Sequence, residues 1–170
     1  MALGVMLLCS CSGNSIEGTW KANAEELMGA SVEQYDKCEI LFTFDDGKAK
    51  VGIDCNGTNA SSGMVMDLGM TIDVEGTYKQ SGDTLSVDFT KSKPKVDLYK
   101  FKIEADEATK KILDAMGMDE KTMKDQVVTQ MEASDFGEAF GVDGKIVIKS
   151  LEGDKLVLEN DGKEVHFTRQ

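Results

Sequence analysis

The stretch Cys38–Cys55, CEILFTFDDGKAKVGIDC, holds Asp46–Gly47 between two segments in which apolar and polar residues alternate. Asp-Gly is typical of a two-residue type I′ turn, because both central positions need a positive φ. The sequence therefore predicts a β-hairpin in which Asp45 faces Lys48. The opposite face of this hairpin is polar apart from Leu41. The inner face consists of apolar pairs: Phe44/Ala49, Phe42/Val51, Ile40/Ile53 and Cys38/Cys55.

Cys38 and Cys55 face each other at the open end of this hairpin. Counted outward from the turn, their pair is not hydrogen-bonded, and such pairs bring the side chains closest, so a disulfide fits. Two buried free thiols are the alternative, because cysteine is common in cores. A metal site needs further His or Cys ligands, and a thiolate nucleophile needs a cationic neighbour, yet the only histidine in the sequence is His166.

The N-terminal stretch, MALGVMLLCSCSGNS, changes abruptly from apolar to small and polar residues at Cys11, which is typical of a signal peptide. It resembles the signal of bacterial lipoproteins, in which a leucine and a small residue, here Leu8 and Ser10, precede the lipidated cysteine. The resemblance implies a signal peptide over residues 1–10, a lipidated Cys11 with a tether over residues 11–16, and anchoring in the bacterial cell envelope. An ordinary hydrophobic tail is the alternative. Export would place the chain in an oxidising compartment, which favours the disulfide.

The remaining residues, 17–170, are enough for one domain with a hydrophobic core. The sequence has 19 basic and 31 acidic residues and a net charge of −12, which argues against a nucleic-acid partner. One proline and 17 glycines suit a chain of strands and tight turns. We therefore expect a single β-rich domain.

Further hairpins follow the same pattern. A turn at Ser81–Gly82 would pair Tyr78 with Leu85, and a turn at Asp161–Gly162 would pair Leu158 with Val165. A three-residue loop over 151–153 would pair Ile148 with Leu156, so that the last three strands form a meander.

Even-numbered residues from Met64 to Tyr78 are mostly apolar, which predicts a long strand with a bend or second hairpin near residues 67–69. A further strand over 96–104 would present Tyr99, Phe101 and Ile103 on one side.

Residues 105–139 break the strand pattern. Asp106 is a candidate N-cap of one helix that stops at Gly117, and a second helix is expected from about Asp119. Apolar residues recur along both at helical spacing, so we expect an inserted helical pair that plugs one end of the sheet rather than a moving lid.

Eight to nine antiparallel strands in short meanders indicate a mainly β, up-and-down barrel. Gly18-Thr-Trp20 near the start and Arg169 at the end resemble the pattern of lipocalins and the wider calycin group, and the closest resemblance is to lipocalin-like lipoproteins of Bacteroides-type bacteria. In that family the arginine packs across the tryptophan ring and closes the barrel. The resemblance therefore implies structural roles for Gly18, Trp20 and Arg169.

The leading functional hypothesis is a membrane-anchored, non-catalytic barrel that binds a small apolar or amphipathic molecule. Methionines among its inward residues can adapt to ligands of varied shape. The candidate cavity residues are Phe42, Val51, Met64, Met66, Met70, Ile72, Tyr78, Val87, Tyr99 and Phe101.

The alternative is a structural or interaction lipoprotein with a filled barrel and an envelope protein as partner, which exposed apolar side chains on the helices would favour. The sequence contains no motif of a hydrolase, metalloprotease or phosphate-binding loop, and predicts no enzyme, metal site or cofactor. His166 alternates with apolar neighbours and should face solvent.

Overall fold

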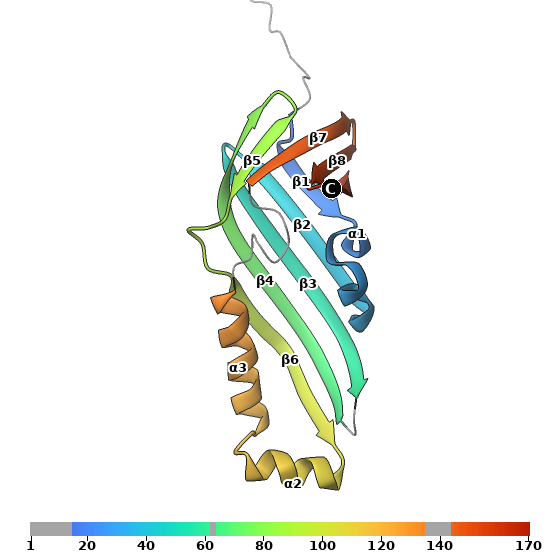
Figure 1. The fold of residues 1–170 in the computed structure, drawn as a ribbon, viewed down its shortest axis with the longest axis vertical. Helices are drawn as coiled ribbons and strands as arrows, with labels where there is room; N and C mark the ends of the chain where they lie inside the picture. The colour runs from blue at the N-terminus through green and yellow to red at the C-terminus, as the bar shows by residue number, and fades with distance from the viewer. Residues whose placement is uncertain (1–14, 62–63, 135–143) are drawn as a thin grey trace, which may run out of the picture.

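The computed structural model describes residues 15–61, 64–134 and 144–170. Within these residues, nine antiparallel strands form one sheet. Eight of them close a barrel in the order β1-β2-β3-β4-β5-β7-β8-β9, with β9 paired back to β1, while β6 lies beside β4 (Figure 1). This confirms the predicted mainly β barrel. The strands are β1 (Gly18–Ala22), β2 (Lys37–Asp45), β3 (Lys48–Ser61), β4 (Met64–Ser81), β5 (Thr84–Asp88), β6 (Lys95–Ala105), β7 (Gly144–Glu152), β8 (Lys155–Asn160) and β9 (Lys163–Arg169).

The β2–β3 hairpin has the predicted register, from Asp45 opposite Lys48 to Cys38 opposite Cys55. Asp46 and Gly47 have φ values of 43° and 75°, as a type I′ turn requires. The two cysteines form a disulfide, with Cα atoms 4.0 Å apart. The cross-strand disulfide is therefore the alternative that the structure supports.

The predicted register of the β4–β5 hairpin is wrong by two residues. Its turn lies at Gly82–Asp83, so Tyr78 pairs with Val87 rather than Leu85. Gly82 has φ 60° at the first central position, which a type II′ turn reserves for glycine. A shift of two leaves every side chain on its predicted face.

The final meander forms as predicted, but one of its two registers differs. Leu158 pairs with Val165 around the Asp161–Gly162 turn, as expected. The β7–β8 turn lies at Gly153–Asp154 instead of a three-residue loop, and Ile148 pairs with Leu158 rather than Leu156. An irregularity between Ile148 and Ser150 absorbs the extra residue.

β4 is one strand of 18 residues, so the second hairpin considered near residues 67–69 does not form. One edge of β4 pairs with β3 from Met64 to Thr77. Its other edge pairs first with β6 and then with β5. The upper part of Figure 1 is consequently a closed barrel, and below it β3, β4 and β6 continue as a three-stranded extension.

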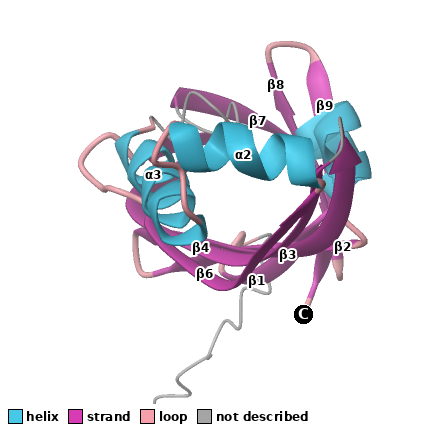
Figure 2. Ribbon diagram, turned by 90° about the horizontal axis from the view of Figure 1, so that it is seen from below, coloured by secondary structure: helices cyan, strands magenta, loops and turns pink. Residues whose placement is uncertain are grey.

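Four helical segments accompany the sheet in the described residues: α1 (Ala24–Met28), the 3₁₀ helix η1 (Gly29–Gln34), α2 (Glu107–Ala115) and α3 (Glu120–Ala133). Asp106 and Asp119 cap α2 and α3 as predicted, accepting hydrogen bonds from the Thr109 and Thr122 amides. α2 crosses the lower end of the molecule, and α3 runs beside β6 (Figure 2). Neither α2 nor α3 contains a fully buried residue, but Val127, Val128 and Met131 of α3 pack against the core, so the expected plug is half-buried. Residues 135–139 of the expected helical region lie outside the described residues.

Candidate binding site

The N- and C-terminal strands are locked together around Trp20. The indole is fully buried, and its Nε1 donates to the Ile16 carbonyl at 2.7 Å. The Arg169 guanidinium lies 4.1 Å from the centre of the Trp20 ring, and Nη1 donates to the Glu17 carbonyl at 2.7 Å. A Cβ on Gly18 would lie 2.6 Å from this same Nη1, so the glycine leaves room for the arginine. The three residues expected to close the barrel are thus in contact.

Aromatic rings fill the upper interior next to this closure. Phe42 packs edge-on against Phe167 at 5.3 Å between ring centres, and Phe44 packs edge-on against Tyr78 at 5.1 Å. Six of the expected cavity residues are buried within the same core. They are Phe42, Val51, Met70, Ile72, Tyr78 and Val87.

The extension carries the rest of the apolar inner face, and this part is only half-buried. Met64, Met66 and Leu68 continue the inner side of β4 below Met70. Their neighbours on β6 are Ile103, paired with Met66, and Phe101, paired with Leu68. We call the five residues Met64, Met66, Leu68, Phe101 and Ile103 the lower apolar face.

α3 stands next to the lower apolar face. It contacts β6, and its Val127, Val128 and Met131 pack against the core. Because these side chains too are half-buried, the helix and the strands leave apolar surface within reach of a ligand. The lower apolar face is therefore the best candidate binding surface among the described residues.

Tyr99 does not belong to this surface, and its predicted inward orientation is wrong. β6 has a register irregularity opposite Met70, between the Gly69–Lys100 and Thr71–Asp97 pairs. The extra residue turns Tyr99 outward and leaves Leu98 buried. Tyr99 is 52% exposed, and its hydroxyl donates to Asp54 at 2.9 Å on the outside of β3.

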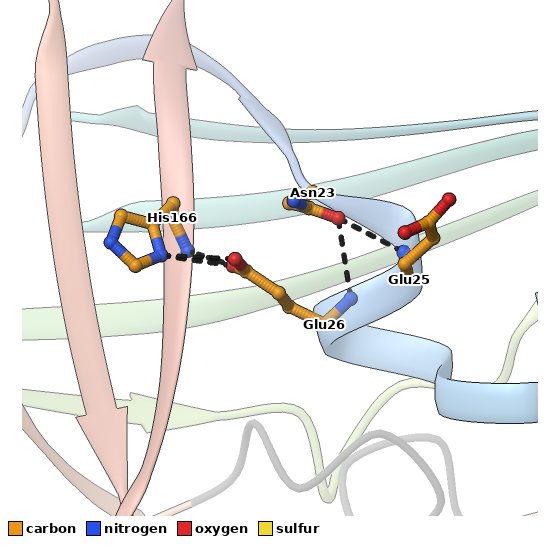
Figure 3. A network of polar contacts seen from close by, with 4 residues as sticks. All are labelled: Asn23, Glu25, Glu26 and His166. Carbon is orange, nitrogen blue, oxygen red and sulfur yellow. Dashed lines mark hydrogen bonds and ion pairs between the residues drawn. The ribbon is translucent and has the colours of Figure 1, made fainter.

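The segment of α1 and η1 packs against β2, β3 and β9, and the Met28 Sδ at the end of α1 lies 3.7 Å from the Cys38 Sγ of the disulfide. Asn23 caps α1 by accepting hydrogen bonds from the Glu25 and Glu26 amides (Figure 3). The Glu26 carboxylate in turn accepts from the His166 backbone amide at 2.7 Å and lies 3.0 Å from the His166 Nδ1. His166 does face solvent as predicted, but it also joins α1 to β9.

Sequence reasoning missed this covering segment, although Asn23 followed by two glutamates is a signal for a helix start. Its far end rests on β3. A Cβ on Gly57 would lie 2.7 Å from both the Gln34 carbonyl oxygen and the Tyr35 Cα, so close packing there requires glycine. Burial raises the pKa of Tyr35 above its ordinary value.

The outer surface of the sheet is highly charged, and several of its ion pairs join neighbouring strands. Lys21 bonds Glu39 at 2.7 Å, Lys50 bonds Asp73 at 2.8 Å, and Lys100 bonds Asp67 at 2.7 Å. The hydrogen bond from Lys21 lowers the pKa of Glu39.

The described residues contain no group of three or more His, Cys, Asp or Glu side chains that could hold a metal ion. In the same part of the chain, every helix is too short or too polar to cross a membrane. Cys11 and residues 1–10 lie outside the described residues, so lipidation stays a prediction.

A protein-family model for a lipocalin-like domain matches residues 16–109, which span the chain from the Trp20 closure to the start of α2. The comparisons with curated proteins and with solved structures gave no match.

Proposed function

Since the chain belongs to the lipocalin-like family, whose barrel suggests a binding-type protein, we propose that it binds a small apolar or amphipathic molecule without catalysis. We place the ligand at the lower apolar face, between the extension and α3. The observation that carries this proposal is the contrast along β4. Its large inner side chains Met70, Ile72, Val74 and Tyr78 are buried, whereas Leu68, Met66 and Met64 below them are half-buried.

The residue types at this end suit a ligand of variable shape. Met64 and Met66 are unbranched and polarisable, so their side chains can repack around different molecules. Phe101 offers a flat apolar surface beside them. A ligand seated there would remove half-exposed apolar area from water, which favours binding by about 25 cal/mol for each Å² buried.

Two neighbouring residues of β4 provide a matched test. Met66 faces inward, whereas Val65 is 37% exposed on the opposite side of the strand. Met66→Asp should abolish the fluorescence gain of anilinonaphthalene sulfonate and the mass excess of any co-purified lipid in native mass spectrometry. Val65→Asp should preserve both signals. Equal losses in the two variants, or the absence of both signals in the parent protein, would contradict the proposal.

We further propose that Cys11 is lipidated and anchors the protein in the bacterial cell envelope. The support is the sequence boundary at Cys11, with Leu8 and Ser10 in the expected positions. Incorporation of an alkyne-labelled fatty acid should be lost in Cys11→Ala, and the protein should leave the membrane fraction. Labelling that persists in this variant would refute the anchor.

An interaction protein is the second candidate function, and α2 favours it. Ile112 and Met116 are one helical turn apart and are 60% and 67% exposed. An envelope protein with an apolar surface would bury them. Crosslinking in cells should then give a discrete adduct that Ile112→Glu eliminates, while probe binding at the lower apolar face is preserved.

A further inference from the structure

The outside of the barrel has a hollow built from three adjacent strands. We call it the outer groove, and its volume is about 260 Å³. Gly52 forms its floor, because it stands between Leu41 of β2 and Asp73 of β4 in the strand pairing and has no side chain. The walls are Glu39, Leu41, Asp54, Thr71 and Asp73.

Tyr99 extends this groove with an aromatic surface. Its backbone is on β6, yet its hydroxyl reaches Asp54 on β3, so the ring must lie across β4. Gly69 makes this possible, because a Cβ there would lie 2.5 Å from the Tyr99 Cε2. One side of the ring therefore rests on the sheet, and the other contributes to the 52% exposure of the residue. The β6 irregularity, Gly69 and Asp54 together hold the ring in one place.

Each carboxylate of the groove already has a partner, which is a lysine for two of them and a tyrosine hydroxyl for the third. Glu39 is paired with Lys21 and Asp73 with Lys50, while Asp54 accepts from Tyr99. Each of these bonds involves one of the two oxygens of its carboxylate. The groove thus offers carboxylate acceptors, and the two lysine ammonium groups bonded to its walls offset most of their charge and add donors at its edge.

From this arrangement we infer that the outer groove is a second binding site, for one pyranose unit of a carbohydrate. A pyranose is neutral, presents C–H groups on its ring face and carries hydroxyls around its rim. The C–H face fits the electron-rich face of Tyr99 and the Leu41 side chain. The hydroxyls donate to Asp54 and Asp73 and accept from the lysines. The site lies outside the barrel and is independent of the proposed apolar ligand.

Amide NMR spectra of the full chain carrying Cys11→Ala provide the test. Glucose, galactose, mannose and N-acetylglucosamine are titrated separately. At least one sugar should cause saturable shifts of the Gly52, Asp54 and Thr71 amides. Tyr99→Ala should weaken this binding by about two- to tenfold, as expected for loss of an aromatic contact. Gly52→Thr should abolish it by filling the groove floor.

Val147→Ala is the control, because Val147 is 42% exposed on β7 and lies outside the groove. It should leave the sugar-dependent shifts unchanged, and all variants should keep the parent spectrum elsewhere. The inference is overturned if none of the four sugars gives saturable shifts, or if both Tyr99→Ala and Gly52→Thr bind normally. Shifts caused by tetramethylammonium instead of sugars would assign the groove to organic cations. Binding of anilinonaphthalene sulfonate should be the same in Tyr99→Ala, so the two proposed sites can fail separately.

Discussion

The closed barrel and its three-stranded extension share β3 and β4 but differ in how their inner faces are covered. In the barrel, strands from both ends of the chain surround the core, and Trp20, Leu85 and Leu156 are fully buried. In the extension, only β3, β4 and β6 remain, with α2 and α3 instead of further strands (Figures 1 and 2). The same alternating pattern along β4 is therefore buried in one region and half-buried in the other.

This difference shows that burial depends on what faces a strand, not on the strand's own pattern. Eight strands wrapped around one axis allow rings from opposite sides to touch, as Phe42 and Phe167 do. A helix beside an open sheet covers its inner face less completely, as α3 does at β6. We therefore expect the barrel to have the higher free energy of local unfolding and the extension to change its conformation more readily.

The largest expected effect is therefore the loss of a core ring from the barrel. Trp20→Ala should lower the free energy of unfolding by about 3–5 kcal/mol, since it leaves a cavity under Arg169. Phe101→Ala, in the half-buried extension, should cost less than half of that. Urea unfolding followed by circular dichroism compares the two variants. Equal losses would mean that the extension is as tightly packed as the barrel.

The disulfide should have the next largest effect, because it fixes the β2–β3 hairpin where the barrel opens into the extension. Its cysteines are 17 positions apart. Closing a loop of that size contributes about 3 kcal/mol by restricting the unfolded chain. The urea midpoint should fall on addition of a reductant, and the Cys38→Ala/Cys55→Ala double variant should show the low midpoint with or without reductant. A midpoint unaffected by reduction would refute this role.

The sequence pattern was sufficient to predict the elements that depend on local chemistry. Asp46–Gly47 set a register that extends unchanged to the disulfide, and Asp106 and Asp119 marked where α2 and α3 begin. The Trp20–Arg169 contact was expected from the family resemblance rather than from spacing. The turn and the helix starts depend on a few neighbouring residues, and the Trp20–Arg169 contact is a feature of the family that the sequence resembles.

The wrong predictions concern positions where two registers compete. Ser81–Gly82 and Gly82–Asp83 both make acceptable turns, and the choice depends on how β4 and β5 pair along their length. Tyr99 turned outward because of a β6 irregularity that alternation alone does not reveal. For the other candidate cavity residues, alternation predicted the inward orientation correctly. It could not predict which of them would be only half-buried, because that depends on α3 and on strands distant in the sequence.

A smaller loss of stability, confined to one helix, is expected when the N-cap of α3 is removed. Asp119→Ala removes the cap of α3 and should destabilise that helix by about 1 kcal/mol. Amide hydrogen exchange should accelerate across α3 while the β1, β2 and β9 amides keep their protection. Uniform acceleration in both regions would show that they unfold as one unit.

The smallest expected effect is the pH dependence of stability that two tyrosines contribute. Tyr78 lies inside the barrel and Tyr99 lies outside it. The pKa of Tyr78 is raised by burial, and that of Tyr99 is raised chiefly by its hydrogen bond to Asp54. Both phenols hold their proton more tightly when folded, so the stability they contribute is complete below the ordinary pKa of about 10 and is lost as the pH rises through the folded values.

Absorbance of tyrosinate, followed against pH, measures this contrast. Asp54→Asn should lower the pKa of Tyr99 towards its ordinary value and leave Tyr78 unchanged. Tyr99→Phe identifies the signal of Tyr99. A titration curve that is the same with and without Asp54→Asn would show that the Tyr99–Asp54 bond does not form in solution.

The 18-residue length of β4 also has a consequence for how such a protein can diversify. Side chains alternate with a period of two, so adding residues in pairs where β3 ends and β4 begins, with a matching pair in β6, preserves every orientation in the barrel. The extension can thus grow or shrink in steps of about 7 Å while the tryptophan closure is untouched. A lineage built on this plan could change the depth of its binding surface by insertion alone, without first redesigning the core that keeps it folded.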